Sequence, residues 1–176
     1  MTKPKIKITY STLSAASPEL HQMFDEAVEQ AKARFGTNYP MLIDGEERWA
    51  DETFEDRSPI DTDWLMGHFQ KGTAEHGRAA LQAARAAFPG WSSTPWQERV
   101  ALMRKAADLI SDRSIDIGAA VALEVGRNRL ESIGDVEETA DLIRYYCEQM
   151  EANNGFVKTM LSESPKHHNT STLKPF

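Results

Sequence analysis

Two amphipathic stretches between Thr94 and Gly155 constrain the fold of this chain more than any other feature. In each of them, apolar residues recur at alternating spacings of four and three, which is the period of one face of an α-helix. The first stripe consists of Trp96, Val100, Met103, Ala107 and Ile110. The second stripe consists of Ile133, Val136, Ala140, Ile143, Cys147 and Met150. Because no residue in either stripe looks catalytic, we interpret this stretch as scaffold.

The residues that flank the two stripes predict where the helices begin and end. Thr94 can cap the first helix, Pro95 suits its first position, and Gln97 completes a capping box with Thr94. The second helix, an acidic one, runs from about Leu130 to Ala152. Asn153-Asn154-Gly155 then suits a left-handed C-terminal cap.

Upstream, the sequence predicts a helix followed by a short β region. The helix opens at Ser17-Pro18, ends at Gly36, and has an apolar face made of Leu20, Phe24, Ala27, Ala31 and Phe35. The apolar run Tyr39 to Ile43 predicts a strand, and Asp44-Gly45 is a strong two-residue hairpin signal. Further strands are expected at Arg48 to Trp49, Thr53 to Arg57 and Trp64 to Gln70.

From Thr73 onward the pattern is helical. Gly77, Leu81, Ala84 and Phe88 share one face of a helix that Pro89-Gly90 is expected to break. A shorter helix spans Ser114 to Glu124, and Gly126 ends it. The fold class predicted for this chain is therefore helix-rich α+β with a short N-terminal β hairpin.

Length, charge and cysteine content exclude several classes of protein. A chain of 176 residues is expected to form one domain with an arm. A net charge of −7 with scattered basic residues disfavours nucleic acid or an anionic membrane as partner. The single cysteine fits a reducing compartment. The sequence has no run of 18 apolar residues, so it predicts no membrane-spanning helix. We therefore expect a cytoplasmic protein.

The residues that could carry chemistry each have a simpler structural interpretation. Cys147, the only thiol, lies on the apolar stripe beside Glu148, so we expect it to be packed rather than nucleophilic. His167-His168 lacks partners at metal-ligand spacing and is interpreted as a solvated loop. His21, His68 and His76 have no evident partners either.

Two polar segments can be interpreted in the same way. Gly126-Arg127-Asn128 completes no phosphate-binding glycine pattern and reads as a helix end followed by a turn. Three of the acidic residues Asp135, Glu137, Glu138 and Asp141 lie near the start of the long helix, where negative charge complements the helix dipole. A solvated acidic face is therefore expected there, not a cation site.

Six segments, taken in order, resemble the N-terminal third of the aldehyde dehydrogenase superfamily. They are Tyr39-Pro-Met-Leu-Ile-Asp-Gly-Glu, Phe54-Glu-Asp-Arg-Ser-Pro-Ile-Asp, Ala83 to Trp91, Pro95 to Ile110 (through Arg99, Leu102, Lys105 and Ala106), Leu123-Glu-Val-Gly-Arg and Ile143-Arg-Tyr-Tyr. Each is loose by itself, but six in the family's order and spacing are specific. The helix from Ser17 to Phe35 leading into Tyr39-Pro40 is most similar to the 1-pyrroline-5-carboxylate dehydrogenase branch.

The resemblance implies an α/β fold of the aldehyde dehydrogenase type, of which this chain is the N-terminal fragment. It also implies NAD(P)-dependent oxidation of L-glutamate γ-semialdehyde to glutamate by the full-length enzyme. The family's catalytic asparagine, nucleophilic cysteine, general-base glutamate and glycine-rich NAD turn lie later in its sequence. Thr172-Leu-Lys-Pro-Phe resembles the lead-in to the strand that precedes that asparagine. Cys147 does not match that nucleophile. Some members hold a monovalent cation near the position of Glu124, but we expect none here.

We accordingly assign no catalytic, cofactor-binding or metal-binding residue, and expect NAD or NADP to bind the full-length enzyme but not this fragment alone. The expected organisation is an N-terminal arm and helix (1–38), a short β region (39–72), the helical part of the cofactor-binding domain (73–155) and the start of the oligomerisation arm (156–176). The expected partners are the remainder of the dehydrogenase chain and, at full length, further copies in a homo-oligomer.

The alternative hypothesis is a free-standing helical binding or regulatory module derived from that family. The two hypotheses differ in whether the chain covers its own apolar stripes. Burial of Trp96, Val100, Ile133 and Ile143 within the chain favours the module, whereas exposure of those faces favours the fragment.

Overall fold

The computed structural model describes residues 17–160 and 170–172. Its helices are α1 (Pro18–Lys32), α2 (Ala74–Ser93), α3 (Trp96–Asp112), α4 (Ser114–Val125) and α5 (Arg129–Ala152), followed by the 3-10 turn η1 (Asn154–Phe156). Its strands are β1 (Thr37–Tyr39), β2 (Met41–Ile43), β3 (Glu46–Arg48), β4 (Thr53–Arg57), β5 (Leu65–Gln70), β6 (Val157–Thr159) and β7 (Thr170–Thr172). The predicted helix-rich class with a short hairpin is confirmed.

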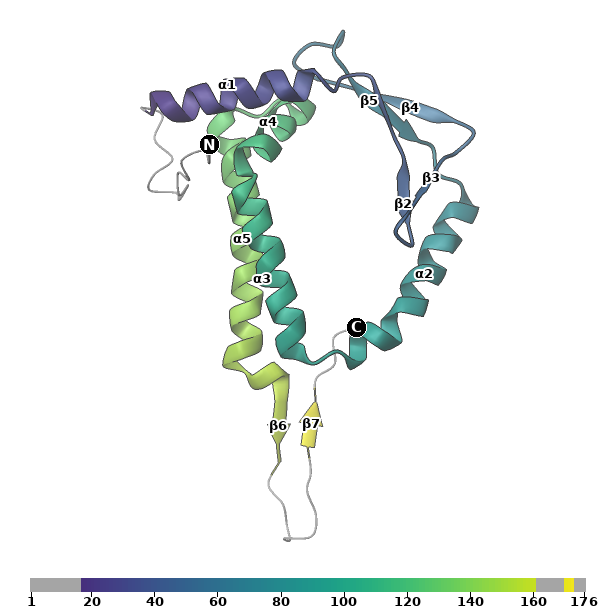
Figure 1. The fold of residues 1–176 in the computed structure, drawn as a ribbon, viewed down its shortest axis with the longest axis vertical. Coiled ribbons are helices and arrows are strands. Elements are labelled where there is room, and N and C mark those ends of the chain that lie inside the picture. Colours follow the sequence, from purple (N-terminus) through teal and green to yellow (C-terminus); the bar gives the residue numbers. More distant parts are fainter. Residues whose placement is uncertain (1–16, 161–169, 173–176) are drawn as a thin grey trace.

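The helices and strands form two separate groups and do not stack into layers. Figure 1 shows α1, α3, α4 and α5 together on one side and strands β1 to β5 on the other, with α2 leading from the strands back to α3. Strands β6 and β7 pair antiparallel and project away from the helices (Figure 1). Helix α2 contains no buried residue, so it contributes nothing to a core within the described chain.

The main core lies where α1 crosses α4 and the first turns of α5. It contains the buried residues Leu20, Phe24, Ala27, Ala119, Ala122 and Ile133. The amphipathic spacing of α1 presents its apolar residues to this core, and Ser17 caps the helix by accepting a hydrogen bond from Leu20 N at 3.3 Å. Helices α4 and α5 approach closely, because a Cβ on Gly118 would stand only 3.1 Å from Ile133 Cγ1.

Helices α3 and α5 lie side by side along their length (Figure 1). The two predicted stripes face each other here: Val100 and Ala107 of α3 and Val136, Ala140 and Cys147 of α5 are all buried. Apolar side chains at helical spacing therefore find their partners within the chain along this seam.

The first strand of the β region pairs with a strand distant in sequence. The three-stranded sheet has the order β1-β5-β4, with β1 parallel and β4 antiparallel to β5. Tyr39 and Phe54 both lie opposite Phe69, and their rings stack on it with centroid distances of 5.1 and 5.9 Å. Gly67 leaves room for the Tyr39 ring, since a Cβ there would stand 2.7 Å from Tyr39 Cε2.

The predicted hairpin at Asp44-Gly45 is confirmed. Strands β2 and β3 pair antiparallel, and both turn residues have positive φ, 57° for Asp44 and 75° for Gly45, as a two-residue hairpin turn requires. The prediction of one strand from Tyr39 to Ile43 is wrong. Pro40 separates β1 from β2, and because it has no N–H to donate, the chain changes sheets at this residue.

The predicted boundary between α2 and α3 is also wrong. Helix α2 continues through Pro89-Gly90 to Ser93, and Thr94 ends it by donating a hydrogen bond from Oγ1 to Gly90 O at 3.0 Å. Pro95 is the N-cap of α3 and no side chain caps that end, so the expected Thr94–Gln97 capping box does not form. Proline is tolerated because α2 is exposed and water can satisfy the carbonyl that loses its donor.

The other predicted helix ends are close to those observed. Gly126, at φ 76°, ends α4, and the long helix ends at Ala152 with left-handed Asn154 and Gly155 soon after it. Helix α1 ends at Lys32, four residues before the predicted stop at Gly36.

Candidate functional site

The only cysteine is buried in the seam between α3 and α5. Cys147 is 4 % exposed, and its Sγ lies 3.8 Å from Val100 O. The thiol lies far from the start of α5, where the helix dipole would act on it. The prediction that Cys147 packs is confirmed.

Two of the histidines have partners that the sequence interpretation missed. His76 Nδ1 accepts a hydrogen bond from Thr73 N at 3.1 Å, and Thr73 Oγ1 accepts one from His76 N, so the two residues form a capping box at the start of α2. His21 Nδ1 lies 3.0 Å from Arg129 Nη1. The interpretation that these two histidines lack partners is therefore wrong. For His76, the three-residue spacing from Thr73 could have predicted the capping box. His167-His168 lies outside the described residues.

Several acidic residues of α5 contact side chains of neighbouring residues. Asp135 pairs with Arg127 at 3.0 Å, Glu137 accepts a hydrogen bond from Ser111 Oγ at 2.6 Å, and Asp141 pairs with Arg144 at 3.0 Å. Within residues 17–160 and 170–172, no three His, Cys, Asp or Glu side chains are grouped as a metal ion would need. Glu138 and Asp141 are exposed, as predicted for a solvated face, while Asp135 and Glu137 are half-buried.

The segment Gly126-Arg127-Asn128 joins two helices. Gly126 ends α4, and Asn128 caps α5 by accepting hydrogen bonds from Leu130 N at 3.1 Å and Glu131 N at 3.0 Å. Its prediction as a helix end followed by a turn is confirmed. The Asn128 side chain is therefore used to cap α5.

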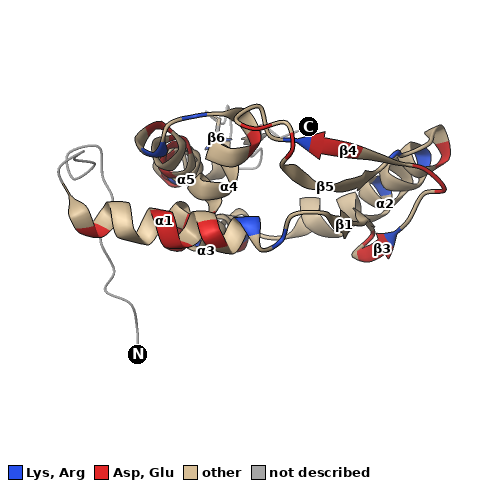
Figure 2. Cartoon of the chain, turned by 90° about the horizontal axis from the view of Figure 1, so that it is seen from above, with Lys and Arg blue, Asp and Glu red and all other residues tan. Residues whose placement is uncertain are grey.

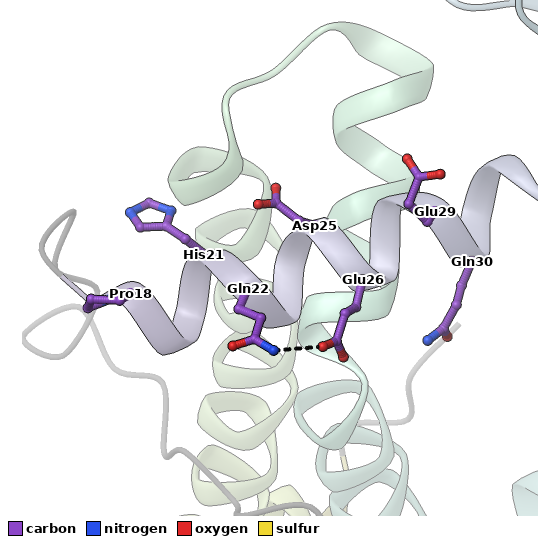
Figure 3. A pocket seen from close by; sticks show the side chains of 7 residues that line it. All are labelled: Pro18, His21, Gln22, Asp25, Glu26, Glu29 and Gln30. Carbon is purple, nitrogen blue, oxygen red and sulfur yellow. Dashed lines mark hydrogen bonds between the residues drawn. The ribbon is translucent and has the colours of Figure 1, made fainter.

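An open hollow of about 750 Å³ lies beside α1. Its described lining comes from that helix alone: Pro18, His21, Gln22, Asp25, Glu26, Glu29 and Gln30. Figure 3 shows these side chains along the helix, with Gln22 Nε2 donating to Glu26 Oε1 at 3.1 Å. Arg129 already engages Asp25 at 3.0 Å and His21. No nucleophile faces these groups, so the hollow has no catalytic arrangement among the described residues.

One flank of the α3–α5 pair carries charged and polar contacts. Arg104 of α3 binds Glu151 of α5, with 2.6 Å between Nη2 and Oε2. Arg144 of α5 binds Asp108 of α3 at 3.0 Å, and this hydrogen bond is the largest cause that raises the pKa of Arg144 above its ordinary value. A further contact joins Ser111 to Glu137. This flank of the α3–α5 pair is therefore a polar surface that water can solvate.

Other surfaces of the same two helices expose large apolar side chains. These residues are Leu102, Met103, Leu109, Leu142, Tyr145 and Tyr146. Leu102 and Leu109 are two turns apart on α3, roughly opposite the flank that holds Arg104 and Asp108. Apolar residues at this spacing form a stripe that needs a partner. The described chain leaves that stripe open.

The described elements intersperse acidic and basic residues (Figure 2). Arginine and lysine side chains commonly pair with carboxylates on the same or a neighbouring element, as in Lys71 with Glu52 and Arg57 with Glu55. No helix in the described part of the chain is long and apolar enough to traverse a bilayer.

Comparison with known proteins shows which family this chain resembles in sequence and in fold. The sequence profile of the aldehyde dehydrogenase family matches residues 47–176. The chain is 31% identical over 129 residues to the 1-pyrroline-5-carboxylate dehydrogenase of Staphylococcus haemolyticus, a match that covers 73% of this chain and 25% of that protein. The chain spans about a quarter of the length of the curated relatives it matches.

Solved structures of the same kind share the fold described above. The 1-pyrroline-5-carboxylate dehydrogenase from Thermus with bound NAD is 28% identical, with a TM-score of 0.81 over 93% of this chain and 31% of that one. Proline utilization A from Bdellovibrio bacteriovorus, inactivated by N-propargylglycine, is 28% identical, with a TM-score of 0.83 over 90% of this chain and 16% of that one. The matched profile covers five of the six sequence segments, all but the one from Tyr39 to Glu46, and the neighbours have the aldehyde dehydrogenase fold that the segments predict. The chain belongs to the aldehyde dehydrogenase family.

Proposed function

We propose that these residues form the N-terminal scaffold of an NAD(P)-dependent aldehyde dehydrogenase that oxidises L-glutamate γ-semialdehyde to glutamate, and that they are inactive alone. The names of the relatives support the substrate, because those covering most of this chain are 1-pyrroline-5-carboxylate dehydrogenases. The scaffold role is supported by the fact that the matched part is a quarter of those proteins.

The observation that carries this proposal is the open apolar stripe of α3 beside a well-packed seam. Of the four residues chosen to separate the two hypotheses, Val100 and Ile133 are buried and Trp96 and Ile143 are half-buried, so these four do not favour the fragment. The open stripe consists of other residues on the same helices. Leu102 is 54% exposed and Tyr146 of α5 is 65% exposed. Exposing large apolar side chains to water costs about 25 cal/mol per Å². A covering element from the rest of a larger enzyme removes that cost.

The domain roles follow from the same reasoning. In this proposal, residues 73–155 are the helical part of the cofactor-binding domain, and 156–176 begin an arm that pairs subunits of a homo-oligomer. Strands β6 and β7 support the arm, since a lone two-stranded ribbon is marginal in water and gains stability by adding strands. The cytoplasmic location stays a prediction.

NAD is the preferred cofactor of the full-length protein, because a Thermus relative is described with bound NAD. Bound NAD supplies the hydride acceptor for aldehyde oxidation. The residues present do not fit its pyrophosphate, because the chain contains neither a GxGxxG nor a GxxxxGK[ST] loop. No residue of this chain is therefore assigned to the cofactor.

The alternative, a free-standing binding or regulatory module, is favoured by one observation. The α1–α4–α5 core is closed, with Ile133 and Ala119 at 0 % exposure. A module needs such a core to fold alone, but it also needs a partner that covers α2 and the open stripe of α3.

The deciding experiment is isolation of the native protein from source cells with an antibody raised against residues 17–160. The expected result is a polypeptide about three to four times the 19.8 kDa of this chain, whose immunoprecipitate reduces NAD with pyrroline-5-carboxylate. A native polypeptide near 19.8 kDa without that activity would favour the module.

A further inference from the structure

The turn η1, which joins α5 to β6, begins with Asn154-Gly155, the only Asn-Gly pair in the sequence. It lies at the base of the β6–β7 ribbon (Figure 1). Asn154 is exposed, and its side-chain amide has no hydrogen-bond partner among the described residues. Asn153, one position earlier, is half-buried and donates from Nδ2 to Gln149 O at 2.9 Å. Of these two neighbouring amides, the one of Asn154 is therefore the one available to react.

The chemistry open to an Asn-Gly pair is an intramolecular attack. The backbone nitrogen of Gly155 adds to Asn154 Cγ, so that an N–Cγ bond forms and the Cγ–Nδ2 bond breaks. Ammonia leaves with the proton that the Gly155 nitrogen gives up. Water then opens the cyclic imide: cleavage of the bond from nitrogen to Cγ gives aspartate, and cleavage of the bond to the main-chain carbonyl carbon gives isoaspartate. Glycine favours ring closure because it has no Cβ to obstruct the approach and has the greatest backbone freedom.

The fold restrains the attacking nitrogen. Gly155 is buried, has φ 66°, and lies so close to the Trp96 indole that a Cβ would overlap the ring. The carbonyl of the same peptide unit is held as well, because Val157 N donates to Asn154 O. For the Gly155 nitrogen to turn toward Asn154 Cγ, this peptide unit must rotate. The contact with the indole and the hydrogen bond must therefore open first.

We propose that Asn154 is a site of spontaneous deamidation and that the contact between Gly155 and Trp96 sets its rate. The exposed amide supplies the leaving group, and the reaction proceeds in those molecules in which Gly155 has left the indole. The inference goes beyond the proposed function and does not depend on it, because every group that takes part is a described residue of this chain or water.

Deamidation would alter the junction between α5 and β6. Either product places a new carboxylate just beyond the C-terminus of α5, where negative charge opposes the helix dipole. Isoaspartate also inserts the side-chain methylene into the main chain and turns the carbonyl that Val157 N uses into a free carboxylate. Gly155 then loses its register against Trp96, so β6 loses the contact that positions it.

The test follows deamidation of the native protein at mildly alkaline pH by tandem mass spectrometry of its peptides, which assigns the reaction to a residue. Asn154 should react before Asn38, Asn128 and Asn153. In urea at the same pH, the rate at Asn154 should rise at least about tenfold, the factor that corresponds to about 1.4 kcal/mol of local opening. Equal rates in the native and unfolded protein overturn the proposal, and so does a native protein in which another of these asparagines reacts first.

Two variants separate the indole contact from general loss of stability. Trp96→Leu should accelerate deamidation of the native protein severalfold and leave the rate in urea unchanged. Leu20→Ala is the matched control, because it removes a buried side chain from the α1–α4–α5 core without touching Gly155, and it should leave the native rate unchanged. Asn154→Gln should abolish the reaction at this position, since a glutamine would have to close a larger ring. An unchanged rate in Trp96→Leu, or the same acceleration in Leu20→Ala, overturns the proposal.

Discussion

Gly155 lies directly against the indole of Trp96, so the end of α5 is seated on the start of α3. A Cβ on Gly155 would overlap the ring, with Trp96 Nε1 only 2.5 Å away. Gly155 also has φ +66°, a conformation that residues with a Cβ rarely adopt. This contact places the first residues of β6 relative to the α3–α5 pair.

Gly155→Ala should therefore be strongly destabilising. The strained φ and the overlap with the ring together should lower the free energy of unfolding by about 2–4 kcal/mol. Urea denaturation followed by tryptophan fluorescence measures it. Gly77→Ala is the control, since a Cβ there meets nothing within 4 Å inside α2 and should stabilise by up to about 1 kcal/mol. Equal midpoints for the two variants would show that the Trp96 contact is absent.

Ser58 joins the turn after β4 to the end of α4. Its fully buried Oγ donates to Leu123 O at 2.6 Å and accepts from Ile60 N at 3.2 Å. Ser58→Ala should lower the free energy of unfolding by about 1–3 kcal/mol, because a buried carbonyl and a partly buried N–H lose their partner. Thermal unfolding by circular dichroism would show it. Ser92→Ala removes only an exposed hydroxyl and should change stability by less than about 0.5 kcal/mol. A neutral Ser58→Ala would mean that water replaces the hydroxyl.

Arg144 bridges α5 to α3 through Asp108 and Ser111. Because its carboxylate partners Asp108 and Asp141 are exposed, Arg144→Met should cost less than about 1 kcal/mol, and less still in 1 M salt. The pKa of Arg144 is raised, chiefly by the hydrogen bond to Asp108. A raised pKa stabilises the fold below the ordinary arginine range and loses that effect only as pH rises through the raised value.

The Arg144 contribution should therefore be constant between about pH 6 and about pH 9. Denaturant midpoints of the wild type and Arg144→Met across that range provide the test. Arg85→Met, on exposed α2 with no ion pair among the described residues, is the control and should be neutral. A difference between wild type and Arg144→Met that grows or vanishes across this pH range would contradict the assignment.

Cys147 should be unreactive until the protein unfolds. It is the only thiol and is 4 % exposed, so a chromogenic thiol reagent should label the native protein only at the rate of opening of the α3–α5 seam. Cys147→Ala should cost roughly 1 kcal/mol, because it leaves a small cavity beside Val100. Stoichiometric labelling within seconds under native conditions would contradict the packed position.

Local sequence signals were sufficient wherever neighbouring residues alone decide the conformation. Ser17 capping α1, the Asp44-Gly45 turn and Gly126 ending α4 were all predicted, because each depends on backbone geometry within a few residues. The apolar stripes of α3 and α5 were predicted for the same reason, since a period of 3.6 is a property of the helix itself.

Prediction failed where two local signals competed. Pro89 predicts a break in the helix, yet α2 continues through it. The carbonyl that loses its N–H donor to the proline lies on an exposed helix and can be hydrated. Thr94 carries the signature of an N-cap, but its hydroxyl is used by the helix before it. The buried Nε of Arg99, which has no hydrogen-bond partner among the described residues, was not predicted, because it depends on which residues pack around that side chain.

The sequence by itself thus determined three features: the approximate order of helices and strands, the apolar stripes that pair α3 with α5, and the family resemblance. The parallel pairing of β1 with β5, the Ser58–Leu123 bond and the seat of Gly155 on Trp96 come only from the tertiary structure. The physical reason is sequence separation. Each of these contacts joins residues about 30 or more positions apart, and local propensity carries no information about which distant surfaces meet.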